Sequence, residues 1–292
     1  MKKLLLIFLI GFVLLSCKKE QSIEPINQKA TTKEVNNSYA RIATDNLLMG
    51  NPSNASTLST TNYLMQKMTY TLSYNSAQGK PNWVSWHLDN TWLGSATRCD
   101  CFASDVLLPS GVYRVSSSSY TNSGFDRGHN CPSGDRTFSS TDNRETFLMT
   151  NMMPQAPTNN QQTWEKLEAY CRTLVSQGNE CYIICGSYGQ GGTGSNGGTT
   201  LTIDNGRVTV PKQIWKVVIV LPKGDNDISR VTTSTRVIAV NTPNINSINT
   251  SWGAYRTSVD AIETATGYDI LSVLPDAIEA TLESRVDNGP TQ

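Results

Sequence analysis

Histidine is scarce in this chain of 292 residues, which contains only His87 and His129. The sequence also lacks a C-x-x-C pair, and His87 is far from any cysteine spacing typical of zinc, so a zinc site is disfavoured. The glycine-rich run at 189–200 lacks the Lys-Ser/Thr ending of a P-loop and predicts a loop rather than a phosphate cradle. These absences leave His129 with few rivals as a proton-transfer group near neutral pH.

An apolar run long enough to span a membrane is also missing. The run at 4–15 has twelve residues, whereas a transmembrane helix needs about twenty. Lys2 and Lys3 precede it and Leu14-Leu15-Ser16-Cys17 ends it, an order typical of a secretory signal peptide. These last four residues resemble the lipobox of bacterial lipoproteins. The resemblance predicts a signal peptide at 1–16 and an acylated Cys17 that anchors the protein outside the cytoplasm, in the outer membrane of the bacterial envelope. An ordinary signal peptide with an incidental cysteine is the alternative.

An excess of positive charge is absent as well. The chain has 24 basic and 24 acidic residues, and without Lys2 and Lys3 the net charge is −2. Proteins that coat nucleic acid are usually basic. Near-neutrality therefore disfavours bulk nucleic-acid binding but permits an enzyme with a local cluster of arginines.

Six cysteines remain once Cys17 is set aside. An even number in an exported protein predicts up to three disulfides, and fifteen pairings are open. The six are Cys99, Cys101, Cys131, Cys171, Cys181 and Cys185.

The chain divides into a polar N-terminal segment and one domain. Residues 17–57 are rich in Lys, Glu, Asn, Ser and Thr, which predicts a flexible tether because they cannot bury enough surface to order themselves. Residues 58–292 are long enough for a single domain. Strands and helices do not alternate regularly, which predicts an α+β fold with a mostly antiparallel central sheet and flanking helices. Strands are expected at 63–74, 83–88, 145–153, 181–186, 213–221 and 236–240, and helices at 160–175, 259–264 and 275–284.

The most informative stretch is Asp126-Arg127-Gly128-His129, followed downstream by Asn160. Hydrolysis of a phosphodiester needs a base that deprotonates water, a cation that stabilises the leaving oxygen, and positive groups around the phosphate. A scarce histidine beside an aspartate and an arginine, with a neutral amide downstream, suggests metal-assisted phosphodiester cleavage.

The same motifs resemble the DNA/RNA non-specific endonuclease family, the ββα-metal nucleases. The resemblance is collinear from about 82 to 172 and continues weakly through 210–217 and 262–267. It implies a ββα-metal catalytic motif within the α+β fold. The residues that carry it are Asp126-Arg127-Gly128-His129, Asn151-x-x-Pro154-Gln155 and Asn160-x-x-x-Trp164-x-x-Leu167-Glu168-x-x-x-Arg172.

The resemblance implies a role for four of these residues. His129 corresponds to the general base, and Asn160 to the single protein ligand of a hydrated Mg²⁺, with Mn²⁺ as the second candidate ion. An amide oxygen is a hard, neutral ligand that leaves the charge of the ion available to the phosphate. Glu168 corresponds to the acid that binds metal-coordinated water, and Arg172 to an arginine near the phosphate.

Helical periodicity supports part of this assignment independently. Asn160, Trp164, Glu168 and Arg172 recur every four residues, so they would follow one side of a helix, with Trp164 anchoring that helix in the core. A plain surface helix with a Glu–Arg pair is the alternative.

The roles of the other candidates stay open. Arg98, in Arg98-x-x-x-Phe102, resembles a phosphate-contacting arginine of the family, and a disulfide between its neighbours would fix or displace it. Arg127 either acts at the site or pairs with Asp126, which is expected to be a brace rather than a metal ligand. Asn151 supports the active-site strand or the water shell of the metal, unless it is only a turn amide.

The leading hypothesis is a Mg²⁺-dependent, sugar-nonspecific endonuclease that hydrolyses DNA and RNA, and the family resemblance implies products with 5′-phosphate ends. Its partners would be these substrates and, through Cys17, a lipid bilayer, with no obligate protein partner. Specificity would be low because the expected contacts are to phosphate rather than to base edges. One alternative is a non-catalytic surface lipoprotein that binds a polymer through its six tryptophans. Another is a thiol hydrolase built on Cys131, although that cysteine is expected to be structural.

Overall fold

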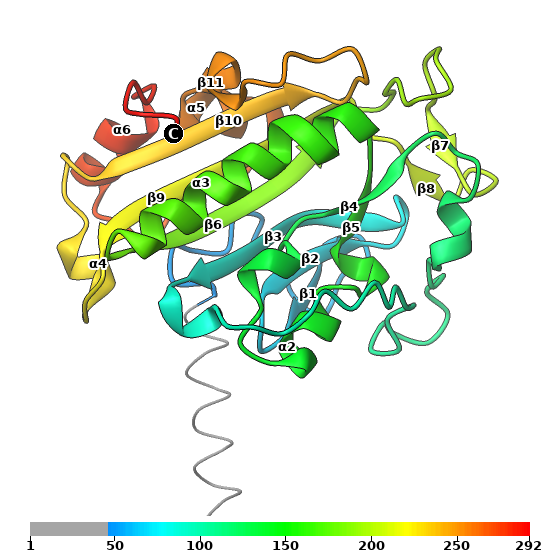
Figure 1. The fold of residues 1–292 in the computed structure, drawn as a ribbon, viewed down its shortest axis with the longest axis horizontal. Helices are drawn as coiled ribbons and strands as arrows, with labels where there is room; N and C mark the ends of the chain where they lie inside the picture. The colour runs from blue at the N-terminus through cyan, green and yellow to red at the C-terminus, as the bar shows by residue number, and fades with distance from the viewer. Residues whose placement is uncertain (1–45) are drawn as a thin grey trace, which may run out of the picture. The chain divides into compact units, whose positions relative to one another are not determined.

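A seven-stranded sheet organises residues 46–292, the part of the chain that this computed structural model describes (Figure 1). Every pair of neighbouring strands is antiparallel, which confirms the predicted α+β fold with its antiparallel central sheet. In order across the sheet, the strands are β1 (Tyr63–Gln66), β2 (Thr71–Asn75), β3 (Lys80–Leu88), β6 (Asn179–Tyr188), β9 (Gln213–Pro222), β10 (Arg236–Pro243) and β11 (Arg256–Thr257).

Strands β6 and β9 form the centre of the sheet because both are long and rich in apolar residues. They pair along all ten residues of each strand. Successive side chains of a strand point to opposite faces of its sheet. In β9, Ile214 and Val218 therefore enter one hydrophobic core, while Trp215 and Val217 enter a second core on the other face.

Helix α3 (Glu165–Ser176) covers the first of these faces (Figure 1). Its Leu167 and Leu174 are buried in the same core as Trp86 of β3. Apolar residues at steps of three and four fall on one side of a helix, so a single face of α3 packs on the sheet. The predicted helix at 160–175 is confirmed in position, although its first turn is not a regular α turn.

Two shorter helices cover the opposite face, α5 (Val259–Thr266) and α6 (Asp276–Glu283). Ile262 of α5 and Leu282 of α6 are buried in one core with Trp215. Both helices lie where the sequence predicts them. The smaller elements are η1 (Asn90–Trp92), η2 (Ser117–Tyr120), η3 (Ser133–Asp135), α2 (Ser140–Glu145), α4 (Asp227–Arg230), η6 (Trp252–Tyr255) and the pair β7 (Thr202–Ile203) and β8 (Val208–Thr209).

Two strand predictions are wrong in detail. The run at 63–74 forms two strands, because the chain turns where the Lys67 amide donates to the Tyr70 carbonyl, 3.0 Å away. The run at 145–153 is mostly not a strand, since short apolar runs do not distinguish strand from helix by periodicity. It contains η4 (Met149–Asn151) and the start of β5 (Met152–Gln155).

Part of the segment predicted as a tether packs into the domain. Met49 and Ala55 are buried in the core that contains Trp215, so packing extends further toward the N-terminus than the boundary predicted at 58. The predicted signal peptide at 1–16, the lipid-bearing Cys17 and the tether up to residue 45 lie outside the described residues. Within 46–292, no helix has both the length and the apolar character needed to cross a membrane.

The six cysteines form one disulfide, within the upper limit of three that their number predicts. Cys99 and Cys101 are bonded to each other. The other four are buried free thiols that contribute to the apolar core beneath α3, where cysteine acts as a small hydrophobic residue. They are Cys131, Cys171, Cys181 and Cys185.

Candidate active site

A small antiparallel sheet of two strands places His129 at the edge of a cavity. Its strands are β4 (Asp126–His129) and β5, which pair with His129 opposite Met152. The strands approach each other so closely that a side chain at Gly128 would not fit: a Cβ there would lie 2.6 Å from the Cβ of Gln155. The glycine of the motif is therefore explained by packing.

His129 is held in an aromatic setting and is uncharged. Its ring meets the ring of Phe147 edge-on at 4.8 Å between centroids, with Phe102 at 5.7 Å. Burial, together with the positive charges of Arg98 and Arg127, lowers the pKa of His129 to about 3. The buried Nε2 atom has no hydrogen-bond partner among residues 46–292. The imidazole is therefore neutral at physiological pH, and its Nε2 atom is not engaged by another residue of this part of the chain.

Asn151 fixes the chain that follows His129. Its side-chain oxygen accepts from the Cys131 amide at 3.0 Å, and its side-chain nitrogen donates to the carbonyls of Cys131 and Thr146, both at 2.8 Å. The backbone oxygen of Asn151 also accepts from the backbone of Asn130. The buried side-chain amide of Asn151 therefore holds the backbone on either side of it in place.

Asn160 lies in a wide helical turn. The segment η5 (Asn159–Trp164) is a π-helix that leads directly into α3. The predicted four-residue repeat of side chains along one side of the helix is therefore not regular in its first turn. Such turns are rare and occur often at functional sites. The Asn160 Nδ2 atom donates to Asp126 Oδ2 at 2.8 Å, and Gln161 Nε2 donates to the same oxygen at 2.8 Å. This contact orients the Asn160 amide and leaves its Oδ1 atom available as a ligand.

Two partly buried ion pairs lie beside this turn. Glu168 is 3.5 Å from the ammonium of Lys216, and Arg172 is 3.0 Å from the carboxylate of Asp135. Burial raises the pKa of Glu168, and the Lys216 charge opposes that rise. Trp164 is buried as predicted, and its ring lies 4.3 Å from the Lys216 ammonium. The pairs hold the side chains of Glu168 and Arg172 in place.

Arg98 and Arg127 supply positive charge on the other side of His129. Arg98 donates to Asp100 at 2.7 Å and to Ser133 at 2.8 Å, so the disulfide next to it leaves it at the site. Arg127 stacks over the ring of Phe102, 4.2 Å from the centroid. Of the two alternatives for Arg127, the pairing with Asp126 does not form, because Asp126 accepts from the amides of Asn160 and Gln161 instead.

One cavity brings most of the predicted site residues together. It has a volume of about 530 Å³, and a neighbouring cavity of about 480 Å³ shares part of its lining and adds Asp126. Asn151 lines neither of them. The six predicted residues that line the first cavity are Arg98, Arg127, His129, Asn160, Glu168 and Arg172.

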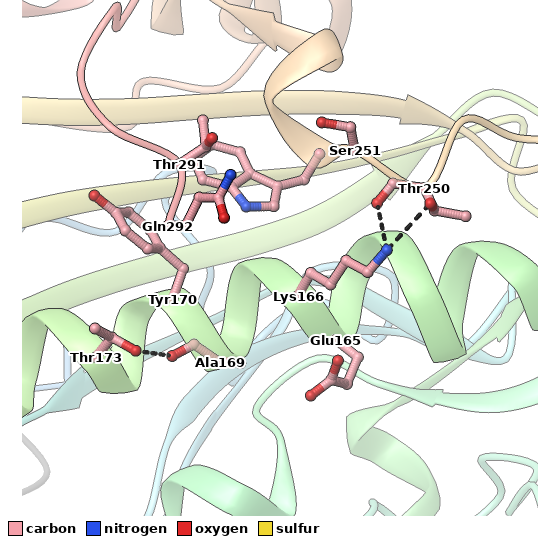
Figure 2. A pocket seen from close by; sticks show the side chains of 10 residues that line it. Glu165, Lys166, Ala169, Tyr170, Thr173, Thr250, Ser251, Thr291 and Gln292 are labelled. Atoms are coloured by element: carbon pink, nitrogen blue, oxygen red, sulfur yellow. Dashed lines mark hydrogen bonds between the residues drawn. The ribbon is translucent and has the colours of Figure 1, made fainter.

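A separate pocket of about 510 Å³ lies along α3 and contains neither His129 nor Asn160 (Figure 2). In it, Lys166 donates to the backbone and side-chain oxygens of Thr250, at 3.4 and 3.1 Å. Glu165 is the one residue that borders both this pocket and the His129 cavity. The predicted site residues therefore line the His129 cavity and not this pocket.

Sequence reasoning missed three residues that contact the predicted site residues, Lys216, Asp135 and Phe147. Lys216 gives a detectable signal, because it is a single charge within the apolar run of β9. Asp135 and Phe147 give none, since only the fold brings them beside Arg172 and His129. Cys131, the nucleophile of the thiol alternative, is fully buried, and burial raises the pKa of its thiol well above the usual range.

Comparison with known proteins agrees with this arrangement. A sequence model of the DNA/RNA non-specific endonuclease family matches residues 50–277. The chain is 51% identical to a nuclease of Nostoc sp. over 244 residues, which is 83% of this chain and 86% of that protein. It is 29% identical to the mitochondrial endonuclease G of Bos taurus over 167 residues, 55% of each chain. A crystal structure of an EndoG/EndoGI complex contains a chain of the same fold, with a TM-score of 0.64 and 22% identity, covering 82% of this chain and 93% of that one. This chain therefore belongs to the DNA/RNA non-specific endonuclease family and is a nuclease.

Proposed function

We propose that this protein is a Mg²⁺-dependent, sugar-nonspecific endonuclease that hydrolyses DNA and RNA and leaves 5′-phosphate ends. One observation carries the proposal: the imidazole of His129 and the amide of Asn160 line the same cavity, together with Glu168 and three arginines. A proton acceptor, an oxygen ligand and positive charge are the three components that phosphodiester hydrolysis needs.

His129 is the proposed base. It is neutral at physiological pH because its pKa is lowered to about 3. A bound phosphodiester would place negative charge beside Arg98 and Arg127 and so offset part of the field that lowers this pKa. The imidazole would then become a stronger base when substrate is present, which is when it must take a proton from water.

Asn160 is the proposed metal ligand. The donor set fits Mg²⁺, which prefers oxygen and is commonly held by few protein ligands while keeping several waters. The contact with Asp126 points the nitrogen of the amide away and frees the oxygen. Glu168 lines the same cavity and can accept hydrogen bonds from water around the ion. When bound, the ion would stabilise negative charge on the phosphate and on the leaving oxygen. Mn²⁺ has the same ligand preference and is the second candidate.

The arginines explain why specificity should be low. Arg98, Arg127 and Arg172 line the cavity and offer charge to phosphate, which DNA and RNA share. Contacts to phosphate position a nucleic acid without reading its sequence. We place the enzyme outside the cytoplasm, anchored through an acylated Cys17 to the outer membrane; this placement rests on the sequence of residues 1–17 alone.

The test is cleavage of supercoiled plasmid and of RNA by the purified protein, with Mg²⁺, with Mn²⁺ or with excess chelator. His87→Ala is the matched control for His129→Ala, since His87 lies in β3 beside Glu180 and outside the His129 cavity. We expect degradation of both substrates only with a divalent ion, a loss of at least about 100-fold in His129→Ala, and little loss in His87→Ala. Undiminished cleavage in chelator, or equal effects of the two substitutions, would contradict the proposal.

The chemistry of the product ends is tested separately. Polynucleotide kinase should label the fragments only after they have been treated with phosphatase, because a 5′-phosphate blocks labelling. Direct labelling of untreated fragments would show 5′-hydroxyl ends and would refute that part of the proposal.

A further inference from the structure

Lys216 is a charged residue within the apolar central strand β9. Its side chain is 1% exposed and lies on the same face of β9 as Ile214 and Val218, toward the core beneath α3. Burial of an ammonium group costs free energy unless the charge is paired, so a position of this kind is normally occupied by an apolar residue. A lysine here therefore calls for an explanation beyond packing.

The Lys216 ammonium contacts two tryptophan rings and one carboxylate. It lies 4.3 Å from the ring centre of Trp164 and 5.5 Å from that of Trp86, within the range of cation–π attraction. Its one ion pair within residues 46–292 is with Glu168, whose Oε1 atom lies 3.5 Å away. Because the rings carry no net charge, Glu168 is the group whose charge this ammonium balances.

Glu168 connects the buried ammonium to the His129 cavity. Its side chain lines the cavity, whereas Lys216 does not. Lys216 engages the Oε1 atom of Glu168, and the Oε2 atom makes no hydrogen bond within residues 46–292. The carboxylate therefore has one oxygen held by Lys216 and one oxygen available to water in the cavity.

The charge of Glu168 depends on Lys216. Burial raises the pKa of Glu168, and the Lys216 ammonium is the strongest influence in the opposite direction. Asp135 raises this pKa further and Arg172 lowers it, but these two groups pair with each other at 3.0 Å. The thiols near the pair are neutral, because burial raises the pKa of each to about 12; they are Cys171 and Cys185.

We propose that Lys216 is a positioning residue for hydrolysis, which keeps the Glu168 carboxylate charged and fixed with one oxygen free to accept from water around the ion. The inference rests on the proposed function, in which Glu168 has that role. Lys216 acts through Glu168, because it does not itself line the cavity. Removal of a partner that orients the groups around a metal typically costs about 10- to 100-fold in metal affinity or activity.

Lys80 provides a matched control, because it is equally buried in the same sheet without an acidic partner. It lies in β3, is 1% exposed and donates to the Pro81 carbonyl at 3.4 Å. It forms no ion pair within residues 46–292 and does not line the His129 cavity. Replacing either lysine by methionine removes a buried charge and keeps an unbranched side chain. A difference between the two variants therefore reports on Glu168.

The first experiment measures cleavage of a labelled duplex against the concentration of Mg²⁺. Lys216→Met should raise the Mg²⁺ concentration for half-maximal activity by about tenfold or more, whereas Lys80→Met should leave it unchanged. Glu168→Gln should have an effect of similar size, and adding Lys216→Met to it should cause no further change. This last comparison holds even if Lys216→Met alone is unstable, because the double variant leaves neither charge unpaired.

The second experiment needs neither metal nor substrate. The carboxyl carbons of glutamate are labelled with ¹³C, and the Glu168 signal in the NMR spectrum is identified by its absence in Glu168→Gln. The chemical shift of a carboxyl carbon changes on protonation, so the titration midpoint of Glu168 can be followed directly. We expect this midpoint to move to higher pH in Lys216→Met and to stay in place in Lys80→Met.

The two experiments separate failure of this inference from failure of the proposed function. The inference is overturned if Lys216→Met and Lys80→Met give the same Glu168 titration or the same Mg²⁺ midpoint. It is equally overturned if Lys216→Met lowers activity further in the Glu168→Gln background. Cleavage that persists in excess chelator would instead refute the proposed function, while the NMR titration would still decide whether Lys216 keeps Glu168 charged.

Discussion

Replacing Asp126 by alanine removes the acceptor that orients the side-chain amides of Asn160 and Gln161, each at 2.8 Å. The oxygen and nitrogen of an amide have nearly the same size and shape, so the hydrogen bond decides which of them faces the cavity. Without Asp126, the Asn160 amide can turn its nitrogen toward the position of the ion.

The expected size of the effect follows from this one contact. A hydrogen bond to a charged group contributes about 1.5–3 kcal/mol, and the lower end applies because Asp126 is half-buried. About 1.5 kcal/mol corresponds to roughly a tenfold change in an equilibrium constant. Asp126→Ala should therefore raise the Mg²⁺ concentration for half-maximal activity about tenfold and leave most of the maximal rate intact.

A second substitution tests the reason for this effect. The two oxygens of an aspartate are equivalent, so a carboxylate at position 160 needs no partner to orient it. Asp126→Ala combined with Asn160→Asp should bring the Mg²⁺ midpoint back toward the wild-type value. The reasoning is refuted if Asp126→Ala leaves the midpoint unchanged, or if the double variant needs more Mg²⁺ than Asp126→Ala alone.

Three further predictions concern the proton acceptor, the core and a buried charge. Because the pKa of His129 is lowered to about 3, kcat/KM should stay constant down to about pH 5, and Arg98→Ala should move the acid limb to higher pH; a wild-type limb near pH 6.5 would contradict this. Trp164→Ala should lower the free energy of unfolding by about 3–5 kcal/mol, whereas Leu58→Ala, at a side chain 95% exposed, should change it little. Burial lowers the pKa of Lys80 to about 8, so the unfolded state binds more protons above that pH and stability should rise between about pH 8 and 10.5. Lys80→Met should remove this rise and add roughly 1–3 kcal/mol at pH 7, as measured by urea unfolding.

Much of the fold could be predicted because its central strands and helices have clear periodicities. The strand in 213–221 is nearly all apolar, and Leu167, Cys171 and Leu174 repeat at helical steps. The run at 145–153 was assigned wrongly because its burial comes from tertiary contacts and not from an alternating pattern. Disulfide pairing also could not be read from sequence, since it depends on which cysteines the fold brings together.

The candidate site could be predicted in its members but not in its contacts. His129 and Asn160 were identifiable from residue type and motif, and the fold places both at one cavity. The hydrogen bond between Asn160 and Asp126 was not identifiable, because it joins a π-helical turn to a strand 34 residues earlier in the chain. Lys216 acts from a strand 48 residues beyond Glu168, a contact that only tertiary structure creates.

The account depends most directly on His129 and Asn160 acting on one bound phosphodiester, and a double-mutant cycle tests that. Single-turnover cleavage of one labelled duplex is measured in Mg²⁺ for His129→Ala, Asn160→Ala and the variant with both changes. We predict that each single substitution slows cleavage by at least about 100-fold, and that the double variant is little slower than the worse single variant, because the two groups work as a unit. Losses that multiply in the double variant, or a single variant that cleaves at the wild-type rate, would contradict the account.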